Sequence, residues 1–173
     1  MKTRLFLLLA LAQCGAPQNP ATRPFHERFE RSPYTVVVFT SAKCGCLTAH
    51  DERLQKLATS YAARGVQFLG VDSEVGATPE NVVEEQRAHG LPFPVLVDQG
   101  ARLAEELGAE YATYTVIVDR SGRILYRGGF DSDRAKLHDD ATHYVRDALD
   151  DLLAGHEPRR REAATLGCVL RRW

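Results

Sequence analysis

The sequence predicts an α/β fold in which a central mixed β-sheet carries helices on both faces. Short runs of β-branched and aromatic residues alternate with stretches whose apolar residues recur at helical intervals. The last two predicted strands flank the turn Arg120-Ser121-Gly122 without a helix between them, which is typical of a hairpin. A chain of 173 residues with 44% hydrophobic content is sufficient for one domain with its own core and flanking segments.

The first half of the chain alternates strand and helix. The run Tyr34–Thr40 predicts a buried strand, and the apolar spacing after it predicts a helix that Gly65 ends. Thr78 is a suitable N-cap for the next helix, and Pro79 suits its first position. Together these signals predict strands over 34–40 and 66–72 and helices over 46–64 and 79–89.

The second half adds one more strand, the hairpin and a closing helix. We predict a strand over 93–98, a short helix over 101–107 and hairpin strands over 115–119 and 123–126. The last helix is predicted over 136–154, because its apolar residues from Leu137 to Leu152 form a stripe. Right-handed crossovers between the parallel strands would place helices on both faces of the sheet.

Segments with other roles are expected on both sides of this domain, which we place at 34–154. Residues 1–12, with Lys2, Arg4 and a short apolar run, predict a signal peptide. Residues 13–33 are expected to be a tether and lead-in, and residues 155–173 a tail. Cleavage after Ala12 would release a soluble protein, whereas a lipobox-like Leu11-Ala12-Gln13-Cys14 would leave a membrane tether on Cys14. Both routes predict an exported, periplasmic protein, soluble or lipid-anchored.

Charge and cysteine content exclude several classes of protein. A net charge of −1 does not indicate a nucleic-acid partner. The 4 cysteines, at positions 14, 44, 46 and 168, are too few and too scattered for a disulfide framework.

Two of the cysteines, Cys44 and Cys46, are predicted where the first strand passes into the first helix. Free backbone N–H groups and the helix dipole at such a position favour a thiolate, and the neighbouring Lys43 adds positive charge. We therefore expect the pKa of Cys44 to be below that of a free thiol, and Cys44 to be the nucleophile that Cys46 resolves. A disulfide across Gly45 would close a small, strained and oxidising ring.

Two alternatives to this redox pair remain open. One is that one cysteine fills the core and the pair is inert. The other is a non-enzymatic module in which Cys44, Cys46 and His50 bind a soft metal ion, since His50 follows Cys46 by one helical turn.

Several longer motifs resemble the redoxin branch of the thioredoxin superfamily. They are F-T-S-A-K-C, V-Q-F-L-G-V-D, L-P-F-P-V-L-V-D and V-D-R-S-G-R-I-L-Y-R-G. The resemblance covers Tyr34 to Leu153, and the closing A-T-L-G-C is similar to the tail of some exported redoxin-domain proteins. It implies a thioredoxin-like fold and an oxidoreductase that acts on protein or small-molecule thiols and disulfides without a cofactor.

The chain departs from the patterns of that superfamily at the site itself. Thiol-disulfide oxidoreductases usually carry C-x-x-C and a cis-proline, whereas here the motif is C-x-C and Tyr114 occupies the proline position, so we expect a trans peptide there. Ser41 fits the hydroxyl position of peroxiredoxins, but Val37 replaces their proline and Tyr114 stands near the place of their arginine. A thiol peroxidase with Cys44 as the peroxidatic cysteine is the alternative reaction.

The tail contains the last cysteine. Cys168 lies in an apolar patch from Leu166 to Leu170 after a polar stretch, so we expect Val169 and Leu170 to dock on the domain. The tail is long enough to bring Cys168 to the active site as a third thiol; the alternative is a docked, unreactive cysteine.

Overall fold

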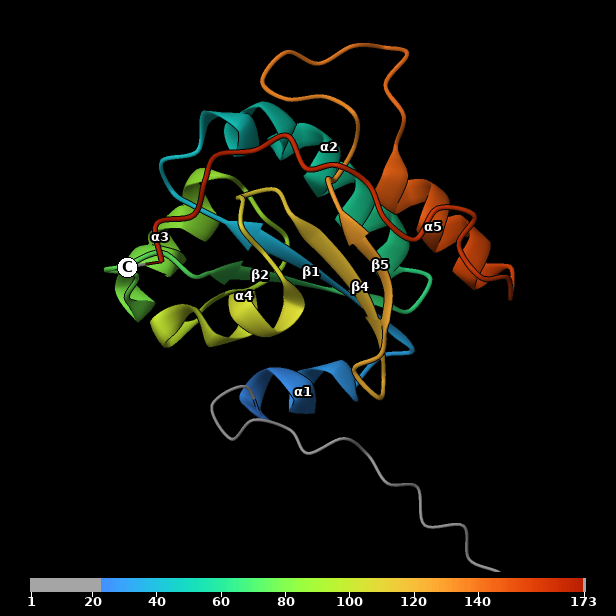
Figure 1. The fold of residues 1–173 in the computed structure, drawn as a ribbon, viewed down its shortest axis with the longest axis horizontal. Coiled ribbons are helices and arrows are strands. Elements are labelled where there is room, and N and C mark those ends of the chain that lie inside the picture. The colour runs from blue at the N-terminus through green and yellow to red at the C-terminus, as the bar shows by residue number, and fades with distance from the viewer. Residues whose placement is uncertain (1–22, 173) are drawn as a thin grey trace, which may run out of the picture.

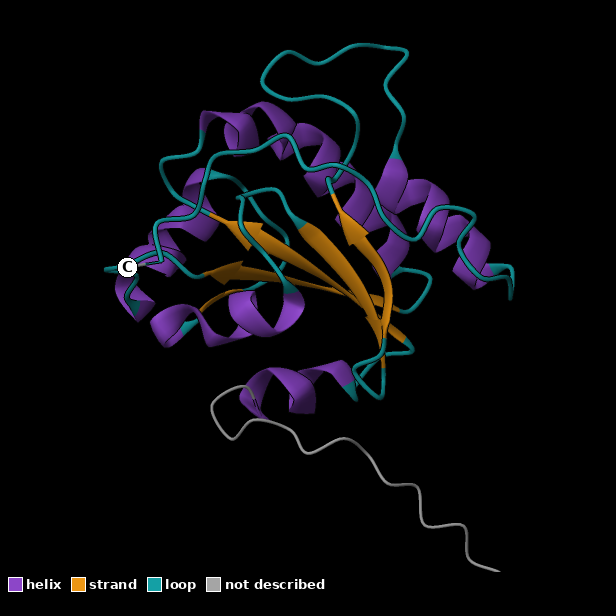
Figure 2. Cartoon of the chain, viewed as in Figure 1, coloured by secondary structure: helices purple, strands orange, loops and turns teal. Residues whose placement is uncertain are grey.

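The structure is a computed structural model that describes residues 23–172, a mixed sheet between helices (Figures 1 and 2). The predicted signal peptide and Cys14 lie outside the described residues. None of the described helices is long and apolar enough to cross a membrane. In chain order the elements are α1 (Arg23–Phe29), β1 (Tyr34–Thr40), α2 (Gly45–Ala62), β2 (Val66–Asp72), α3 (Pro79–Ala88), β3 (Val95–Val97), η1 (Gln99–Ala101), α4 (Arg102–Leu107), β4 (Thr115–Asp119), β5 (Ile124–Gly128) and α5 (Tyr144–Leu153).

The sheet is mixed, as predicted, and β1 is its central strand. The strand order is β3-β2-β1-β4-β5. β1 runs parallel to β2 and antiparallel to β4, and β5 completes the hairpin with β4. The four residues Val36 to Phe39 are almost completely buried, because β1 has neighbours on both edges and side chains packed on both faces.

Helices cover both faces of the sheet, which confirms the predicted α/β architecture. In Figure 1, α2 and α5 lie on one side of the sheet, and α1 and α4 lie on the other. The Tyr61 hydroxyl of α2 donates to the Asp150 carboxylate of α5 at 2.7 Å. On the opposite face, the His26 Nε2 atom of α1 lies 2.6 Å from a carboxylate oxygen of Glu106.

The predicted last helix, 136–154, was too long, because α5 begins only at Tyr144. Asp133 accepts a hydrogen bond from the His138 backbone N–H at 2.8 Å and lies 2.8 Å from the His138 ring nitrogen. Ser132 and Thr142 are joined by two more hydrogen bonds. These local bonds hold residues 131–143 as a loop in competition with helix formation, despite the apolar spacing.

The third strand is also shorter than the predicted 93–98. Asp98 does not extend β3; its carboxylate accepts hydrogen bonds from the Leu103 and Ala104 N–H groups at 2.9 Å. Asp98 thus satisfies free N–H groups at the start of α4, and the strand ends at Val97.

Candidate active site

Cys44 is the N-cap residue of α2, at the point where the chain leaves the end of β1. Its N–H donates to the Ser41 carbonyl at 3.0 Å, and its sulfur accepts a hydrogen bond from the Leu47 N–H at 3.4 Å. The side chain is 1% exposed. The structure therefore places Cys44 at the helix start that the sequence predicted, but with almost no access to solvent.

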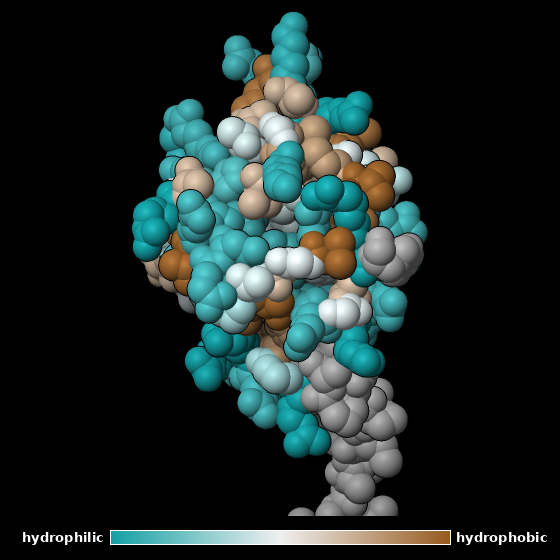
Figure 3. Space-filling model, turned by 90° about the vertical axis from the view of Figure 1, so that its left-hand side faces the viewer, coloured by the Kyte–Doolittle hydropathy of each residue, from teal (hydrophilic) through white to brown (hydrophobic). Residues whose placement is uncertain are grey.

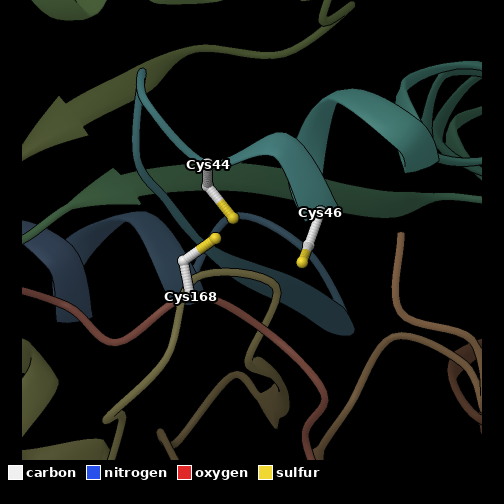
Figure 4. A group of neighbouring side chains, drawn as sticks. All are labelled: Cys44, Cys46 and Cys168. Atoms are coloured by element: carbon white, nitrogen blue, oxygen red, sulfur yellow. The ribbon is translucent and has the colours of Figure 1, made fainter.

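Three sulfur atoms meet at this helix start. Cys46 lies in the first turn of α2 and is 6% exposed. Cys168, from the C-terminal tail, is partly exposed. The sulfur atoms of these three cysteines lie within 4.8 Å of one another, and Figure 4 shows the side chains of Cys44 and Cys168 pointing toward each other. The tail thus brings Cys168 to the site, as its length had allowed.

Backbone hydrogen bonds position Cys168. The Ala112 N–H donates to the Cys168 carbonyl at 2.8 Å, and the Leu170 N–H donates to the Glu110 carbonyl at 2.9 Å. The docking prediction is right for Leu170, which is 4% exposed, and wrong for Val169, which is 66% exposed. Neighbouring side chains alternate here because this part of the tail is extended and forms a bridge between Val169 and Tyr111.

The expected low pKa of Cys44 is wrong. Burial, together with a hydrogen bond to Cys168, raises the pKa of Cys44 to about 11. Burial also acts to raise the pKa of Cys168, but hydrogen bonds from Cys44 and Cys46 and the charge of Arg134 outweigh it, and the pKa is lowered. These contacts therefore favour the charged form of Cys168, whereas burial disfavours the charged form of Cys44.

Lys43, Ser41 and Tyr114 frame the site without contacting its sulfur atoms through any described hydrogen bond. Lys43 is exposed, whereas Ser41 is buried and holds Cys44 through its carbonyl. Tyr114 accepts a hydrogen bond from the Phe39 N–H at 2.9 Å through its carbonyl. The described residues contain no cis peptide bond, so the peptide before Tyr114 is trans, as expected.

His50 is not positioned as a metal ligand, which corrects the ligand set Cys44, Cys46 and His50. Its Nδ1 atom lies 2.7 Å from the Cys46 carbonyl oxygen, and its Nε2 atom lies 3.0 Å from a carboxylate oxygen of Asp131. A carbonyl and a carboxylate only accept, so both ring nitrogens donate to them when the imidazole is protonated, and this arrangement favours the protonated form. Burial alone would lower the pKa of His50, but the bonds to Asp131 and Cys46 raise it.

The three cysteines are the one group of potential metal ligands among the described residues. Thiolates are the ligands that soft ions such as Cu(I) prefer. Asp131 and Arg134, which influence His50 and Cys168, were both missed in the sequence. They follow β5 in a loop far from the cysteines in sequence, and no motif marks them.

The face of the molecule that forms the left-hand side of Figure 1 carries no single large apolar patch in the view of Figure 3. Figure 3 shows small hydrophobic groups on this face that lie scattered among hydrophilic side chains. A surface of this kind does not indicate a large permanent interface.

Comparison with known proteins shows which family and which solved structures the chain resembles. The Redoxin family model matches residues 13–141. An uncharacterized conserved protein from Geobacillus kaustophilus is 28% identical, with a TM-score of 0.76 over 85% of this chain and 80% of that one. A hypothetical protein from Sinorhizobium meliloti 1021 is 30% identical, with a TM-score of 0.75 over 85% of this chain and 83% of that one.

More distant structures share the fold. A thioredoxin-like protein from Aeropyrum pernix is 22% identical, with a TM-score of 0.50 over 57% of this chain and 70% of that one. No curated protein matches the sequence.

Proposed function

This chain belongs to the redoxin family, a thioredoxin-fold family of thiol-redox proteins, and we propose that it catalyses thiol–disulfide exchange through Cys44, Cys46 and Cys168. One observation carries the proposal: three sulfur atoms lie within 4.8 Å of one another at the start of α2. Thiols this close can exchange a disulfide among themselves with only small movements of their side chains.

Cys44 is the central sulfur in this scheme. A thiolate of the protein attacks a substrate disulfide, which forms a mixed disulfide and releases one substrate thiolate. A second cysteine of the protein then attacks the protein sulfur of that mixed disulfide and releases the other substrate thiolate. The substrate disulfide is reduced to two thiols, and two protein thiols are oxidised to one disulfide. Cys44 can form that disulfide with Cys46 or with Cys168.

The geometry supports exchange better than peroxide reduction. A peroxidatic cysteine needs a thiolate that peroxide can reach. Cys44 is 1% exposed, and burial raises its pKa to about 11. We infer that proteins or small molecules that carry thiols and disulfides are the substrates.

Export is part of the proposal. Residues 1–12 have the composition of a signal peptide, and an oxidising compartment suits a disulfide-exchanging protein. Residues 1–20 fused to a reporter are expected to direct its secretion. If Cys14 is lipidated, Cys14→Ala moves the exported protein from the membrane to the soluble fraction. A reporter that stays inside the cell contradicts export.

Oxidation in glutathione buffers tests the reaction. The reduced full-length protein is equilibrated at stepwise ratios of oxidised to reduced glutathione, and its disulfides are mapped by mass spectrometry. We expect one intramolecular disulfide that contains Cys44, whereas Cys44→Ser can pair only Cys46 with Cys168. A protein that forms no disulfide at any ratio, but reacts rapidly with hydrogen peroxide in stopped flow, would be a peroxidase.

A further inference from the structure

The C-terminal strap, residues 161–171, is attached to the domain along its length. At its start, the Arg127 N–H donates to the Arg161 carbonyl at 2.9 Å. Near Cys168, the strap is bonded to Glu110 and Ala112, and at its end the Val75 N–H donates to the Arg171 carbonyl at 2.6 Å. Figure 1 shows the strap crossing from α5 past the start of α2 toward α3. The strap therefore follows one defined path over the active site.

Glycines on both sides of the contact allow the strap to approach closely. A Cβ atom on Gly167 would lie 1.8 Å from the Ala112 carbonyl oxygen. A Cβ atom on Gly128, which has a φ of +139°, would lie 2.2 Å from the Ala163 carbonyl oxygen. Both neighbours are backbone atoms, which cannot move aside as a side chain can. Strap and domain thus fit each other only with glycine at these positions.

The order of exposure places Cys168 outermost among the three thiols. Cys44 and Cys46 are 1% and 6% exposed, whereas Cys168 is partly exposed. Val169 is 66% exposed and Leu170 is 4% exposed, so the strap has one face toward solvent and one toward the domain at this point. An external disulfide must approach a sulfur in line with the bond that breaks, and among the three described cysteines Cys168 offers the most open approach.

The charges and hydrogen bonds around the cysteines also favour Cys168 as the first of the three thiols to react. The positive charge of Arg134 and hydrogen bonds from the other two cysteines favour a thiolate on Cys168, although burial opposes it. The thiolate is the attacking form of cysteine.

We propose that Cys168 is the thiol that first attacks the external disulfide and that it passes the oxidation inward to Cys44. The inference rests on the proposed function and adds a catalytic residue to it. The Cys168 thiolate attacks a disulfide RSSR′, forms a mixed disulfide with R and releases R′S⁻. The Cys44 sulfur then attacks the Cys168 sulfur and its proton passes to the departing RS⁻, so the Cys44–Cys168 disulfide forms and RSH leaves. The strap is therefore a reactive arm that holds one thiol between solvent and the buried pair.

A different model uses the same contacts. If Cys44 is attacked directly, the strap only covers it, and loosening the strap should make Cys44 react faster. Loss of Cys168 should slow the oxidation of Cys44 if Cys168 relays it, and should not slow it if the strap only covers Cys44. The two models can therefore be distinguished by experiment.

Reaction with glutathione disulfide distinguishes them. In Cys44→Ser, the glutathione adduct is expected at Cys168, identified by peptide mapping. In Cys168→Ser, oxidation of the remaining pair is expected to slow by about tenfold or more, since the most accessible of the three thiols is lost. Val169→Ala, at the exposed position next to Cys168, is the matched control and is expected to keep the fast first step. An adduct found first at Cys44, or a faster reaction in Cys168→Ser, overturns the inference.

Gly167→Ala tests the position of the strap while all three thiols remain. Its Cβ clashes with Ala112, so the strap should separate locally from the domain. The relay then predicts that the adduct at Cys168 forms but passes to Cys44 about tenfold more slowly or worse. Unchanged transfer contradicts the relay. If the wild-type protein exchanges no disulfide at all, the proposed function fails as well; if it exchanges through Cys44 alone, only this inference fails.

Discussion

Replacing Glu85 with glutamine is expected to stabilise the protein at pH 8 and to remove much of the pH dependence of its stability between pH 4.5 and 7. Glu85 lies on α3 and is 2% exposed, and neither carboxylate oxygen has a hydrogen-bond partner among the described residues. Burial, followed by the negative charge of Asp72, raises its pKa from 4.5 to about 7.

The direction in which stability changes with pH follows from the number of protons that the folded and unfolded states bind. Between the two pKa values the folded state keeps its proton while the unfolded state releases it, so stability is fully present below pH 4.5 and falls as the pH rises to 7. At about 1.4 kcal/mol per pH unit, the rise of the Glu85 pKa from 4.5 to about 7 corresponds to a loss of about 3 kcal/mol in the free energy of unfolding. Glutamine carries no charge but leaves a buried amide, so we expect the variant to regain about 1–3 kcal/mol at pH 8.

Urea unfolding at each pH from 4 to 8 measures the effect. The wild-type free energy of unfolding should decline across the interval more steeply than that of Glu85→Gln. Glu84→Gln is the matched control, since Glu84 is the exposed neighbour on the same helix. If both variants show the same pH dependence, Glu85 is ionised in the folded protein at low pH and the reasoning is wrong.

Two further predictions concern the surroundings of the cysteines. His50→Gln should lower the free energy of unfolding by about 3 kcal/mol near pH 6, because it breaks a buried ion pair with Asp131. The pKa of His50 is raised above 6.5, so this loss should be largest below pH 6.5 and should shrink as the pH rises through the folded pKa; a constant loss would contradict a protonated His50. Leu170→Ala, which truncates the buried anchor of the strap, should cost about 2 kcal/mol and quicken proteolysis at the tail. Val169→Ala, at an exposed position, is its control, and equal effects would refute the anchoring role.

The central strands could be predicted from the sequence because their boundaries are local. Tyr34–Thr40, Val66–Asp72 and Thr115–Asp119 are found with the predicted boundaries. Each is a run of β-branched, aromatic or other apolar residues between turn or capping residues. The start of α5 could not be predicted in the same way. The apolar stripe continued into residues 136–143, but the hydrogen bonds of Asp133 with His138 overrode it.

The position of the candidate site was also visible in the sequence, whereas its electrostatics were not. A strand followed by a helix places Cys44 at the helix start from spacing alone, and the structure makes it the N-cap. Whether that thiol becomes a thiolate depends on burial and on the contact with Cys168, a residue 124 positions away in the sequence. The ion pair of His50 joins residues 81 positions apart, so no local pattern could reveal that His50 is committed to Asp131.

Cys44 is shared by two alternative disulfides, and the fold favours one of them. A bond to Cys46 would close a small, strained ring, and side chains two positions apart on a helix do not face each other. The side chains of Cys44 and Cys168 already point toward each other (Figure 4). We therefore expect the oxidised protein to contain Cys44–Cys168 and a reduced Cys46. When the Cys46 thiolate attacks Cys44, it forms the strained pair and releases Cys168 as a thiolate. A disulfide therefore cross-links the strap to the start of α2 only while the site is oxidised through Cys168, and in the reduced protein hydrogen bonds and the buried Leu170 hold the strap.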